Sequence, residues 1–308
     1  LSNIRFVTGS LLDASDLGRF DYIDCCGVLH HLEDPDAGMR ALVAALAEGG
    51  GIGFMVYGEL GRSGVYPAQE LLRLLAPAAV PAGERVATAR RLVAALPETN
   101  LLRRNPLLGD HLASDAGIFD LLLHARDRAY RVPDVLALLA RAGLRLVTFI
   151  EPLRYEPETW TSDPVLRRRL AGLPAADRAA AAELLASVHK VHIAYAVRDD
   201  HPGDTVARPT DDAIPALRDM EAAALARAIR PGAPLTVRFD GVPLPLALPA
   251  LAGPIVARID GRRTVAAIRD ELRASVDPRL GEAAFADAFA ATYRALNGIN
   301  RLLIAGYG

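Results

Sequence analysis

The chain has few cysteines and almost no lysine, and both shortages restrict what it can do. Cys25 and Cys26 are the only cysteines among 308 residues, and they are adjacent. Neighbouring cysteines do not form an ordinary structural disulfide, so nothing in the sequence requires an oxidising compartment. Lys190 is the single lysine, and the formal net charge is −2. This charge argues against a nucleic-acid protein that works by bulk electrostatics.

Long apolar segments are absent as well. No apolar run approaches the ~18–20 residues that cross a bilayer, and the first residues lack the pattern of a secretory signal. A content of 51% hydrophobic and 23% charged residues is typical of globular proteins, and the length suggests about two domains. We therefore expect a soluble, cytoplasmic protein without a membrane partner.

The first informative segment is FDYIDCCGVL, residues 20–29, whose apolar, β-prone composition predicts a buried strand. Asp34 is a favourable helix N-cap, and Pro35 suits the first helical position. The apolar stripe that follows has helical spacing and includes Leu46. We expect glycines 49–51 to end this helix.

A second apolar strand is expected at IGFMVYG, residues 52–58. Strand, helix and strand form a βαβ unit, so the two strands should be parallel. Ligands of such sheets bind beyond the carboxyl ends of the strands. That edge would carry Cys26, Gly27, Val28, Leu29, His30, Tyr57 and Gly58.

The cysteine pair and the pair His30 and His31 are residue types that bind metals. Adjacent residues of an extended chain point to opposite faces, whereas the ligands of tetrahedral sites are usually separated by two or more residues. We therefore expect no metal. The cysteines are interpreted as strand residues, because a buried Cys acts as a small hydrophobe. One histidine is interpreted as structural and the other as a residue of the pocket.

The pattern FDYIDCCGVLHHLEDPDAGMRAL, followed by EGGGIGFMVYG, resembles the second half of a class I S-adenosylmethionine-dependent methyltransferase. In that family a strand leads through a Val-Leu-His-His-Leu segment into a helix, a Gly-Gly turn and the next strand. The resemblance covers residues 1–198. It implies an α/β fold with an incomplete Rossmann-like class I methyltransferase sheet and a helical insertion, and S-adenosylmethionine (SAM) as the cofactor.

The resemblance also implies cofactor-binding residues. NIRFVTGSLLDASDL resembles the family's third strand, whose end contacts the adenine ring, so Ser10 and Leu11 would flank the adenine. Cys26, Gly27 and Val28 would lie beside the methionine part, mainly through backbone groups. The position of Ser10 is usually acidic in the family, where it binds the adenine amino group.

Two parts of the family's cofactor site have no counterpart in the sequence: the Gly-rich loop of the first strand and the acidic residue that ends the second. The family's sheet order is 3-2-1-4-5-7-6, and strands 3 and 4 correspond to residues 4–8 and 21–25. Strand 3 would have no neighbour and strand 4 an unpaired edge, which is a liability. We expect a fragment of a longer chain that binds SAM poorly by itself.

Residues 59–130 contain helix-period apolar segments separated by prolines and are expected to form a helical insertion. In the family, insertions at this point cover the substrate pocket. HARDRAYRV, residues 124–132, is interpreted either as a substrate-facing loop or as a solvated, salt-bridged linker. The residues proposed to bind substrate are Tyr57, Arg62, His124, Arg128 and Tyr130.

The rest of the first domain should complete the sheet. We expect a helix at 133–143, a strand at 144–150, helices within 163–188 and an antiparallel strand at 191–198. His189 and His192 flank that last strand and are expected to be structural.

Residues 199–215 are polar and contain three prolines, which predicts a linker. Residues 216–308 predict a small, mainly helical, winged-helix-like domain: a hairpin, a helix before Asp260, a helix from Thr264, a third helix and a final strand. IDGRRTVAAI is similar to a segment of peptide-chaperone domains, so a peptide or protein partner is expected. Acidic residues among the arginines disfavour DNA, and a packing or dimerisation role is the alternative.

The resemblance implies in-line attack of a nucleophile on the sulfonium methyl group. Proximity and alignment in a dry pocket contribute much of the acceleration, and a base is needed only when the nucleophile is protonated. His30 and His31 are candidate bases because an unperturbed imidazole titrates near pH ~6.5. Tyr57 could orient the acceptor or contact the cofactor.

Three functions stay open at this stage. The first is a methyltransferase with an unknown acceptor. The second is a methyltransferase-like scaffold without catalysis, which the serine at position 10 motivates. The third is a peptide- or protein-binding role of the C-terminal domain.

Overall fold

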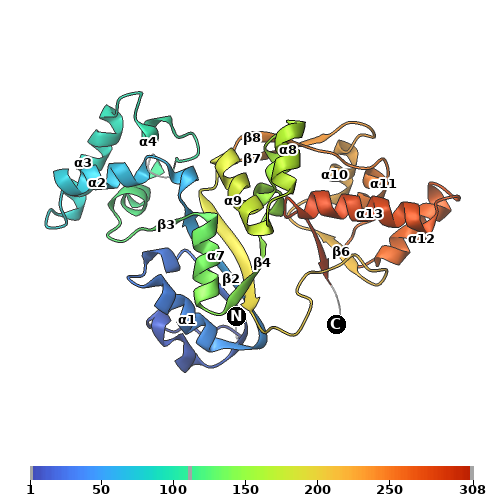
Figure 1. Cartoon of the computed structure of the whole chain (residues 1–308), viewed down its shortest axis with the longest axis horizontal. Coiled ribbons are helices and arrows are strands. Elements are labelled where there is room, and N and C mark those ends of the chain that lie inside the picture. The colour runs from blue at the N-terminus through green and yellow to red at the C-terminus, as the bar shows by residue number, and fades with distance from the viewer. Residues whose placement is uncertain (1–2, 110–112, 306–308) are drawn as a thin grey trace. The chain divides into compact units, whose positions relative to one another are not determined.

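The computed structural model describes residues 3–109 and 113–305, which form two compact units (Figure 1). Unit 1 comprises residues 1–146 and 173–201, and unit 2 comprises residues 147–172 and 202–308. Residues 147–172, which the sequence places with the methyltransferase part, thus cluster with the C-terminal residues. No helix in the described part of the chain is long and apolar enough to span a membrane.

The main sheet has the strand order β1-β2-β5-β4, and β3 pairs with β2 beside that path. β1 and β2 are parallel, and β2 and β5 are antiparallel. This order matches the 4-5-7-6 part of the family's sheet, so the expected parallel pair and the antiparallel strand are confirmed. The strands are β1 (Phe20–Cys26), β2 (Leu46–Gly58), β3 (Ala129–Tyr130), β4 (Leu144–Phe149) and β5 (Val191–Arg198).

The helix between β1 and β2 is α1 (Pro35–Ala45), and it begins as the sequence predicts. The side chain of Asp34 accepts the backbone N–H of Ala37 at 3.0 Å, and Pro35 is the first helical residue. This local signal is strong because one carboxylate oxygen satisfies an N–H group that has no partner within the helix.

The end of α1 differs from the prediction. Leu46 already belongs to β2, and all three glycines expected to stop the helix, residues 49–51, lie within the strand. The guanidinium of Arg198 donates to the carbonyls of Val43, at 2.6 Å, and Leu46, at 3.2 Å. Arg198 thereby satisfies carbonyls that a further helical turn would use, so a distant strand ends the helix.

β1 is not the buried strand that its composition predicts. Among the described residues it pairs only with β2, and Cys25 is its one buried side chain. The prediction of burial is wrong because one edge of the strand is uncovered. The predicted unpaired edge is confirmed.

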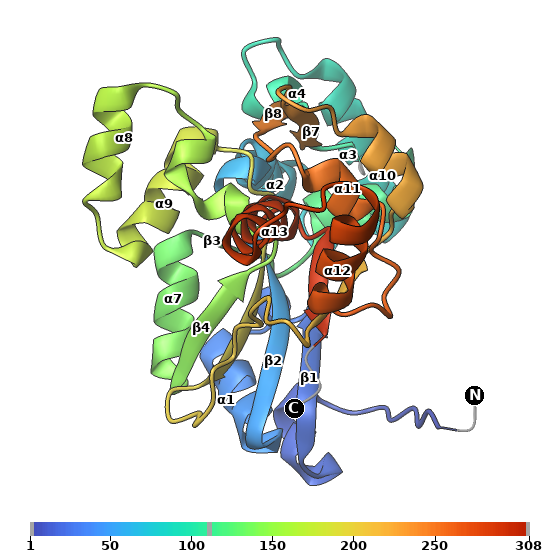
Figure 2. The same ribbon diagram turned by 90° about the vertical axis from the view of Figure 1, so that its right-hand side faces the viewer.

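Residues 4–8, IRFVT, do not form the expected strand. They have no regular secondary structure, and the side chain of Phe6 is 92% exposed. A strand needs a neighbour to pair its backbone groups, and the described residues provide none here. The segment runs outward from β1 (Figure 2), and the 3₁₀ segment η1 (Leu11–Leu17) then packs against α1.

The helical insertion is confirmed. Its members are α2 (Val65–Leu75), α3 (Ala82–Ala95), α4 (Leu101–Arg104), α6 (Asp115–Ile118) and the π-helical turn η4 (Phe119–Leu123). They share a buried apolar cluster of their own that includes Leu72, Ala89 and Leu121. The other expected helices are α7 (Val132–Arg141), α8 (Pro164–Ala171) and α9 (Ala175–Ala186). Short 3₁₀ turns are η2 (Leu29–His31), η3 (Leu60–Arg62), η5 (Pro152–Tyr155) and η6 (Pro157–Thr159).

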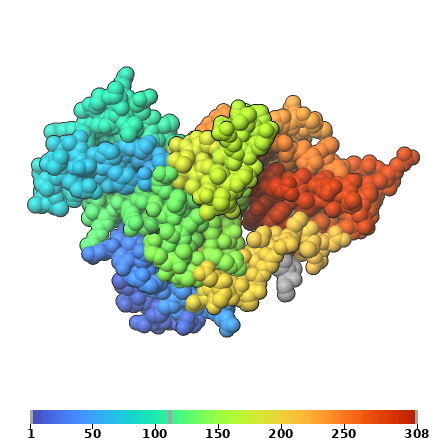
Figure 3. All heavy atoms as spheres, viewed as in Figure 1, coloured from blue at the N-terminus to red at the C-terminus, as the bar shows by residue number. Residues whose placement is uncertain are grey.

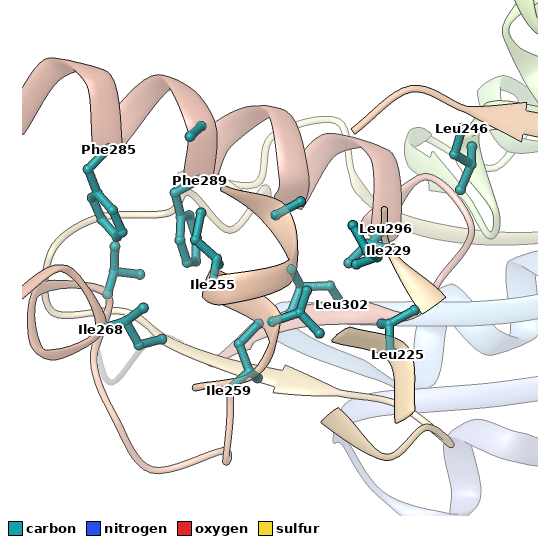
Figure 4. Close-up of a cluster of buried hydrophobic side chains, with 14 of the residues drawn as sticks. Leu225, Ile229, Leu246, Ile255, Ile259, Ile268, Phe285, Phe289, Leu296 and Leu302 are labelled. Atoms are coloured by element: carbon teal, nitrogen blue, oxygen red, sulfur yellow. The ribbon is translucent and has the colours of Figure 1, made fainter. Parts of the chain in front are cut away.

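The C-terminal residues of unit 2 contain the expected hairpin, helices and last strand. The elements are β6 (Ile214–Leu217), α10 (Ala222–Ala228), β7 (Leu235–Phe239), β8 (Val242–Leu246), α11 (Ala252–Val256), α12 (Val265–Ser275), α13 (Glu282–Asn297) and β9 (Leu302–Ala305). β6 pairs with β9, and β7 with β8. Figure 4 shows Phe285, Phe289 and Leu296 of α13 in one core with Ile255, Ile268 and Leu302. A winged-helix assignment stays a prediction.

Candidate functional site

A stack of rings lies at the carboxyl ends of β1 and β2. The centroids of the His30 and Tyr57 rings are 3.8 Å apart, and those of His30 and His31 are 4.2 Å apart. The ring of His124, from the loop after η4, is 3.9 Å from the ring of His31. The fold thus gathers four residues that the sequence singled out, from three separate segments. This agrees with the rule that ligand sites of such sheets lie at this edge.

Arg62 closes the stack on the far side of Tyr57. Its guanidinium carbon is 3.7 Å from the Tyr57 ring centroid, a cation–π geometry. The same guanidinium donates to the carboxylate of Asp127 at 2.9 Å, and the two side chains are 6% and 0% exposed. The amide of Gln69 donates to the same carboxylate oxygen at 2.9 Å. A buried, hydrogen-bonded ion pair therefore fixes the position of Arg62 under the ring.

Sequence reasoning missed Asp127 and Gln69. Asp127 lies within the segment 124–132 that drew attention, but no motif separates it from its charged neighbours. Gln69 is a polar residue in a helix, where exposure is the usual outcome. Only the long-range packing of α2 against this loop reveals their role.

His30 is 1% exposed, and burial lowers its pKa from 6.5 to about 3. The nearby His31, Arg62 and His124 lower this pKa further, and the backbone carbonyl of Met55 acts weakly in the opposite direction. Buried imidazoles resist protonation because the charged form is poorly solvated. At neutral pH His30 is therefore a neutral ring and too weak a base to take a proton.

His31 has a different environment. It is half-buried, and its Nδ1 lies 2.8 Å from the backbone carbonyl oxygen of Arg126. A carbonyl only accepts, so Nδ1 carries the hydrogen and Nε2 of the neutral ring keeps its lone pair. Nδ1 of His124 in turn accepts the N–H of Arg126 at 3.2 Å, so that ring is held in the opposite tautomer. The backbone of one residue orients both imidazoles.

The loop 124–132 is bound to the ring stack through its backbone. The N–H of Arg128 donates to the carbonyl of His30 at 3.1 Å. The guanidinium of Arg126 pairs with Glu33 at 3.0 Å on the surface. Arg128 itself is exposed and lies 5.2 Å from the centroid of the buried Tyr130 ring. These contacts anchor the loop to η2. The exposed pair of Arg126 with Glu33 is of the kind expected for a solvated, salt-bridged linker, while the backbone contact with His30 keeps the loop beside the ring stack.

The residues assigned to the cofactor divide into two groups. Cys26 and Val28 are exposed at the end of β1, and Gly27 turns the chain there with a φ of 78°. Ser10 caps η1, because its hydroxyl accepts the N–H of Leu12 at 3.2 Å, and Leu11 lies against α1. No hydrogen bond or ring contact among the described residues joins the two groups.

Neither cysteine is an activated nucleophile. Burial raises the pKa of Cys25 to about 11. Partial loss of solvation and a hydrogen bond from Sγ to Asp24 raise the pKa of Cys26 to about 11, with Sγ 3.1 Å from the carboxylate oxygen. Both stay thiols at neutral pH, whereas the thiolate is the reactive form. Within residues 3–109 and 113–305, no group of three or more His, Cys, Asp or Glu side chains is arranged to hold a metal ion.

Comparison with known proteins places this architecture among methyltransferase folds. No family model matches the chain. An uncharacterized protein of Synechococcus sp. is 35% identical over 193 residues, which are 59% of this chain and 45% of that protein. Two solved structures of PKMT2 from Rickettsia typhi have TM-scores of 0.64 and 0.60 to this chain at 12% identity. The second structure contains AdoHcy.

Both structures cover 96% of this chain, while the chain covers 60% of each. The chain therefore spans about half the length of the proteins it matches, from 45% to 60%. At 12% identity the likeness concerns the fold alone. The chain has the α/β fold of a methyltransferase structure.

Proposed function

We propose that this chain forms part of a SAM-dependent methyltransferase that modifies an amino group of a polypeptide. One observation carries the proposal: the strand order β1-β2-β5-β4 places the ring stack at the carboxyl end of a methyltransferase-like sheet. The AdoHcy-bound PKMT2 structure, which shares this fold, supports the choice of cofactor. A cytoplasmic location remains a prediction from composition.

The residues at the end of β1 fit one side of such a cofactor. Gly27 exposes backbone groups at a turn with positive φ, and Cys26 and Val28 beside it are exposed. We assign these three to the methionine part and Ser10 and Leu11 to the adenine. When bound, SAM supplies an electrophilic methyl group on a sulfonium, and AdoHcy is the leaving product.

The other side of the cofactor site is proposed to come from residues outside this chain. The open edge of β1 and the exposed side chains of Phe20 and Tyr22 on that strand support this proposal. So does the length of the matched proteins. Exposed strand edges and aromatic side chains are usually covered in native proteins.

We assign the proton transfer to His31. An amine acceptor such as lysine has a pKa of ~10.4 and must lose a proton before it attacks a methyl group. Nε2 of His31 keeps a lone pair because Nδ1 donates to the carbonyl of Arg126. Its buried neighbour His30 cannot take this role, since burial lowers its pKa to about 3.

The remaining candidates are assigned to shape and orientation. Tyr57 lies between the ring of His30 and the guanidinium of Arg62, so it forms an aromatic wall of fixed position. His124 lies against His31, and Arg128 is the exposed cation of the anchored loop. Tyr130 is buried and would shape the pocket from behind.

The test is methyl transfer by the whole protein that contains this chain, with methyl-tritiated SAM and a library of lysine-containing peptides. We expect label in the peptides, and a rate at least ~100-fold lower for His31→Asn. His201→Asn is the matched control, because His201 bonds the carbonyl of Gly49 outside the ring stack. Absence of label would support the non-catalytic scaffold, and an unchanged rate for His31→Asn would remove His31 from the mechanism.

A further inference from the structure

Unit 2 contains a groove of about 1060 Å³ that the methyl-transfer chemistry does not use. Three segments form it: residues 152–162 with Arg167 of α8, the end of β8 at 244–247, and the second half of α13 at 290–298; Pro209 completes the lining. Part of its rim is visible in Figure 3, where the yellow-green residues of α8 meet the red residues of α13. The volume is at the upper end of ligand-binding clefts.

The groove is preformed. The N–H of Leu153 donates to the carbonyl of Gly298 at 3.0 Å and ties one wall to the end of α13. The indole N–H of Trp160 donates to the carbonyl of Arg154 at 2.9 Å, which fixes the ring in that wall. The facing side of α13 has small residues, Ala290, Ala291 and Ala295, so the helix surface stays open to a ligand.

The wall at β8 has an unusual hydrogen-bonding edge. Asp240 and Gly241 have φ values of 47° and 85°, the signature of a two-residue hairpin turn, and Phe239 pairs with Val242. Hydrogen-bonded and non-hydrogen-bonded pairs alternate from there. Pro243 and Pro245 therefore fall at the positions whose backbone faces away from β7.

Those two prolines have no N–H, so their part of the free edge offers carbonyl acceptors only. Carbonyls of alternate residues are about 6.7 Å apart along a strand, the same repeat as N–H groups on one edge of an extended polypeptide. Two copies of β8 cannot pair through these positions, because neither would supply a donor. The edge suits a different chain that brings N–H groups.

The charge of the lining also selects the partner. It contains two carboxylates, Glu156 and Glu158, and two guanidinium groups, Arg167 and Arg294, so the formal charges balance. On neighbouring α12, Arg269 pairs with Asp211 at 2.8 Å, which neutralises a cation that nucleic acid would need. A balanced, mainly apolar groove is complementary to an uncharged, apolar segment.

We propose that this groove binds an extended, apolar polypeptide segment of another protein. The segment lies along β8, donates N–H groups to the carbonyl of Pro245 and its neighbour on the free edge, and packs side chains on Trp160, Tyr293 and the alanines of α13. The proposal does not depend on methyl transfer, so either activity can fail while the other holds.

Trp160 is the only tryptophan of the chain, so its fluorescence reports on the groove directly. A phage-displayed library of random 12-residue peptides is selected against the 308-residue protein, and the enriched peptides are synthesised and titrated. We expect apolar sequences, a saturable shift of the Trp160 emission, and binding at least ~10-fold weaker when the N–H groups of alternate residues are methylated.

Ala291→Phe fills the groove, and Ala286→Phe places the same side chain on an exposed position of α13 outside it. Binding should be lost in the first variant and kept in the second, with thermal unfolding showing that both are folded. Failure to enrich peptides, enrichment of highly charged sequences, equal binding by the two variants, or indifference to N-methylation would each overturn the proposal.

Discussion

At the scale of single residues, burial separates two adjacent histidines into different chemical roles. His30 is enclosed by Tyr57 and His31, and its low pKa makes it a neutral packing residue. His31 is half-buried and has its tautomer set by a backbone carbonyl. The same residue type therefore contributes shape at one position and proton-accepting capacity at the next.

The pKa of His30 predicts a pH-dependent stability. Its folded pKa of about 3 lies below the value of ~6.5 for an unfolded imidazole, so the unfolded chain takes up a proton first as the pH falls. The contribution of His30 to the free energy of unfolding is therefore complete above pH ~6.5. As the pH falls toward 3, it is lost by up to ~1.4 kcal/mol per pH unit. The free energy of unfolding can be measured with urea at several pH values between about 7 and 5. It should fall less steeply with decreasing pH for His30→Asn than for the wild type. Equal slopes would show that His30 is not buried in its neutral form.

The Arg62–Asp127 pair predicts a large loss of stability on removal of one charge. Asp127→Asn leaves a buried guanidinium without its counter-ion, and we expect the free energy of unfolding to fall by ~3–5 kcal/mol. The control is Asp115→Asn, which breaks the exposed pair with Arg90 and should cost less than ~1 kcal/mol. Chemical denaturation measures both, and similar losses for the two variants would contradict the burial of the pair.

Sequence patterns identify several residues of this site, but they do not identify the contacts that hold those residues in place. The motif around His30 and His31, and the charged loop that contains His124, are visible as short segments. The partnership of Asp127 with Gln69 and Arg62 depends on how a helix packs on a loop 58 and 65 residues away. No local periodicity encodes such a contact.

At the scale of elements, residues distant in sequence decide where helices begin and end. The carboxylate of Glu183, on α9, accepts the N–H of Val132 at 3.0 Å and so caps α7 from outside. Its other oxygen lies 3.3 Å from Nε2 of His192 on β5. Arg198 ends α1 in a comparable way through the carbonyl of Val43. Local signals predicted the start of α1 at Asp34, but not these tertiary caps.

Glu183→Gln tests this external cap. The Glu183 side chain is fully buried; burial raises its pKa, but hydrogen bonds from His192 and Val132 outweigh burial and lower it overall. Its stabilisation is therefore present above the unfolded pKa of ~4.3 and lost as the pH falls below it. At neutral pH we expect the variant to lose ~2–3 kcal/mol and to exchange the Val132 amide hydrogen faster.

Asp177→Asn provides the control for that variant. Asp177 is an exposed acid in the first turn of the same helix α9, and its neutralisation should cost less than ~1 kcal/mol. If hydrogen exchange at Val132 responds equally to both substitutions, Glu183 is not the cap of α7.

Residues 4–8, which do not form the expected strand, show another limit of prediction from local sequence patterns. IRFVT has the composition of a strand, yet β-propensity largely reflects packing against neighbours. Without an adjacent strand the segment stays irregular and Phe6 stays exposed. β1 and β2 do form, and each has the other as a pairing partner within this chain.

At the scale of the whole molecule, the uncovered edge of β1 is the feature that most constrains function. The sheet has the order β1-β2-β5-β4, and the proposed SAM contacts at Cys26, Gly27 and Val28 lie at the end of its outermost strand. We therefore propose that residues beyond this chain complete the site.

Calorimetric titration with AdoHcy tests this claim most directly. We predict no saturable binding at micromolar concentrations by the 308-residue chain, and micromolar binding, about −8 kcal/mol, by the whole protein that contains it. Failure of the whole protein to bind would remove SAM from the proposed function. Micromolar binding by the 308-residue chain alone would contradict the central claim, because one side of the site would then suffice.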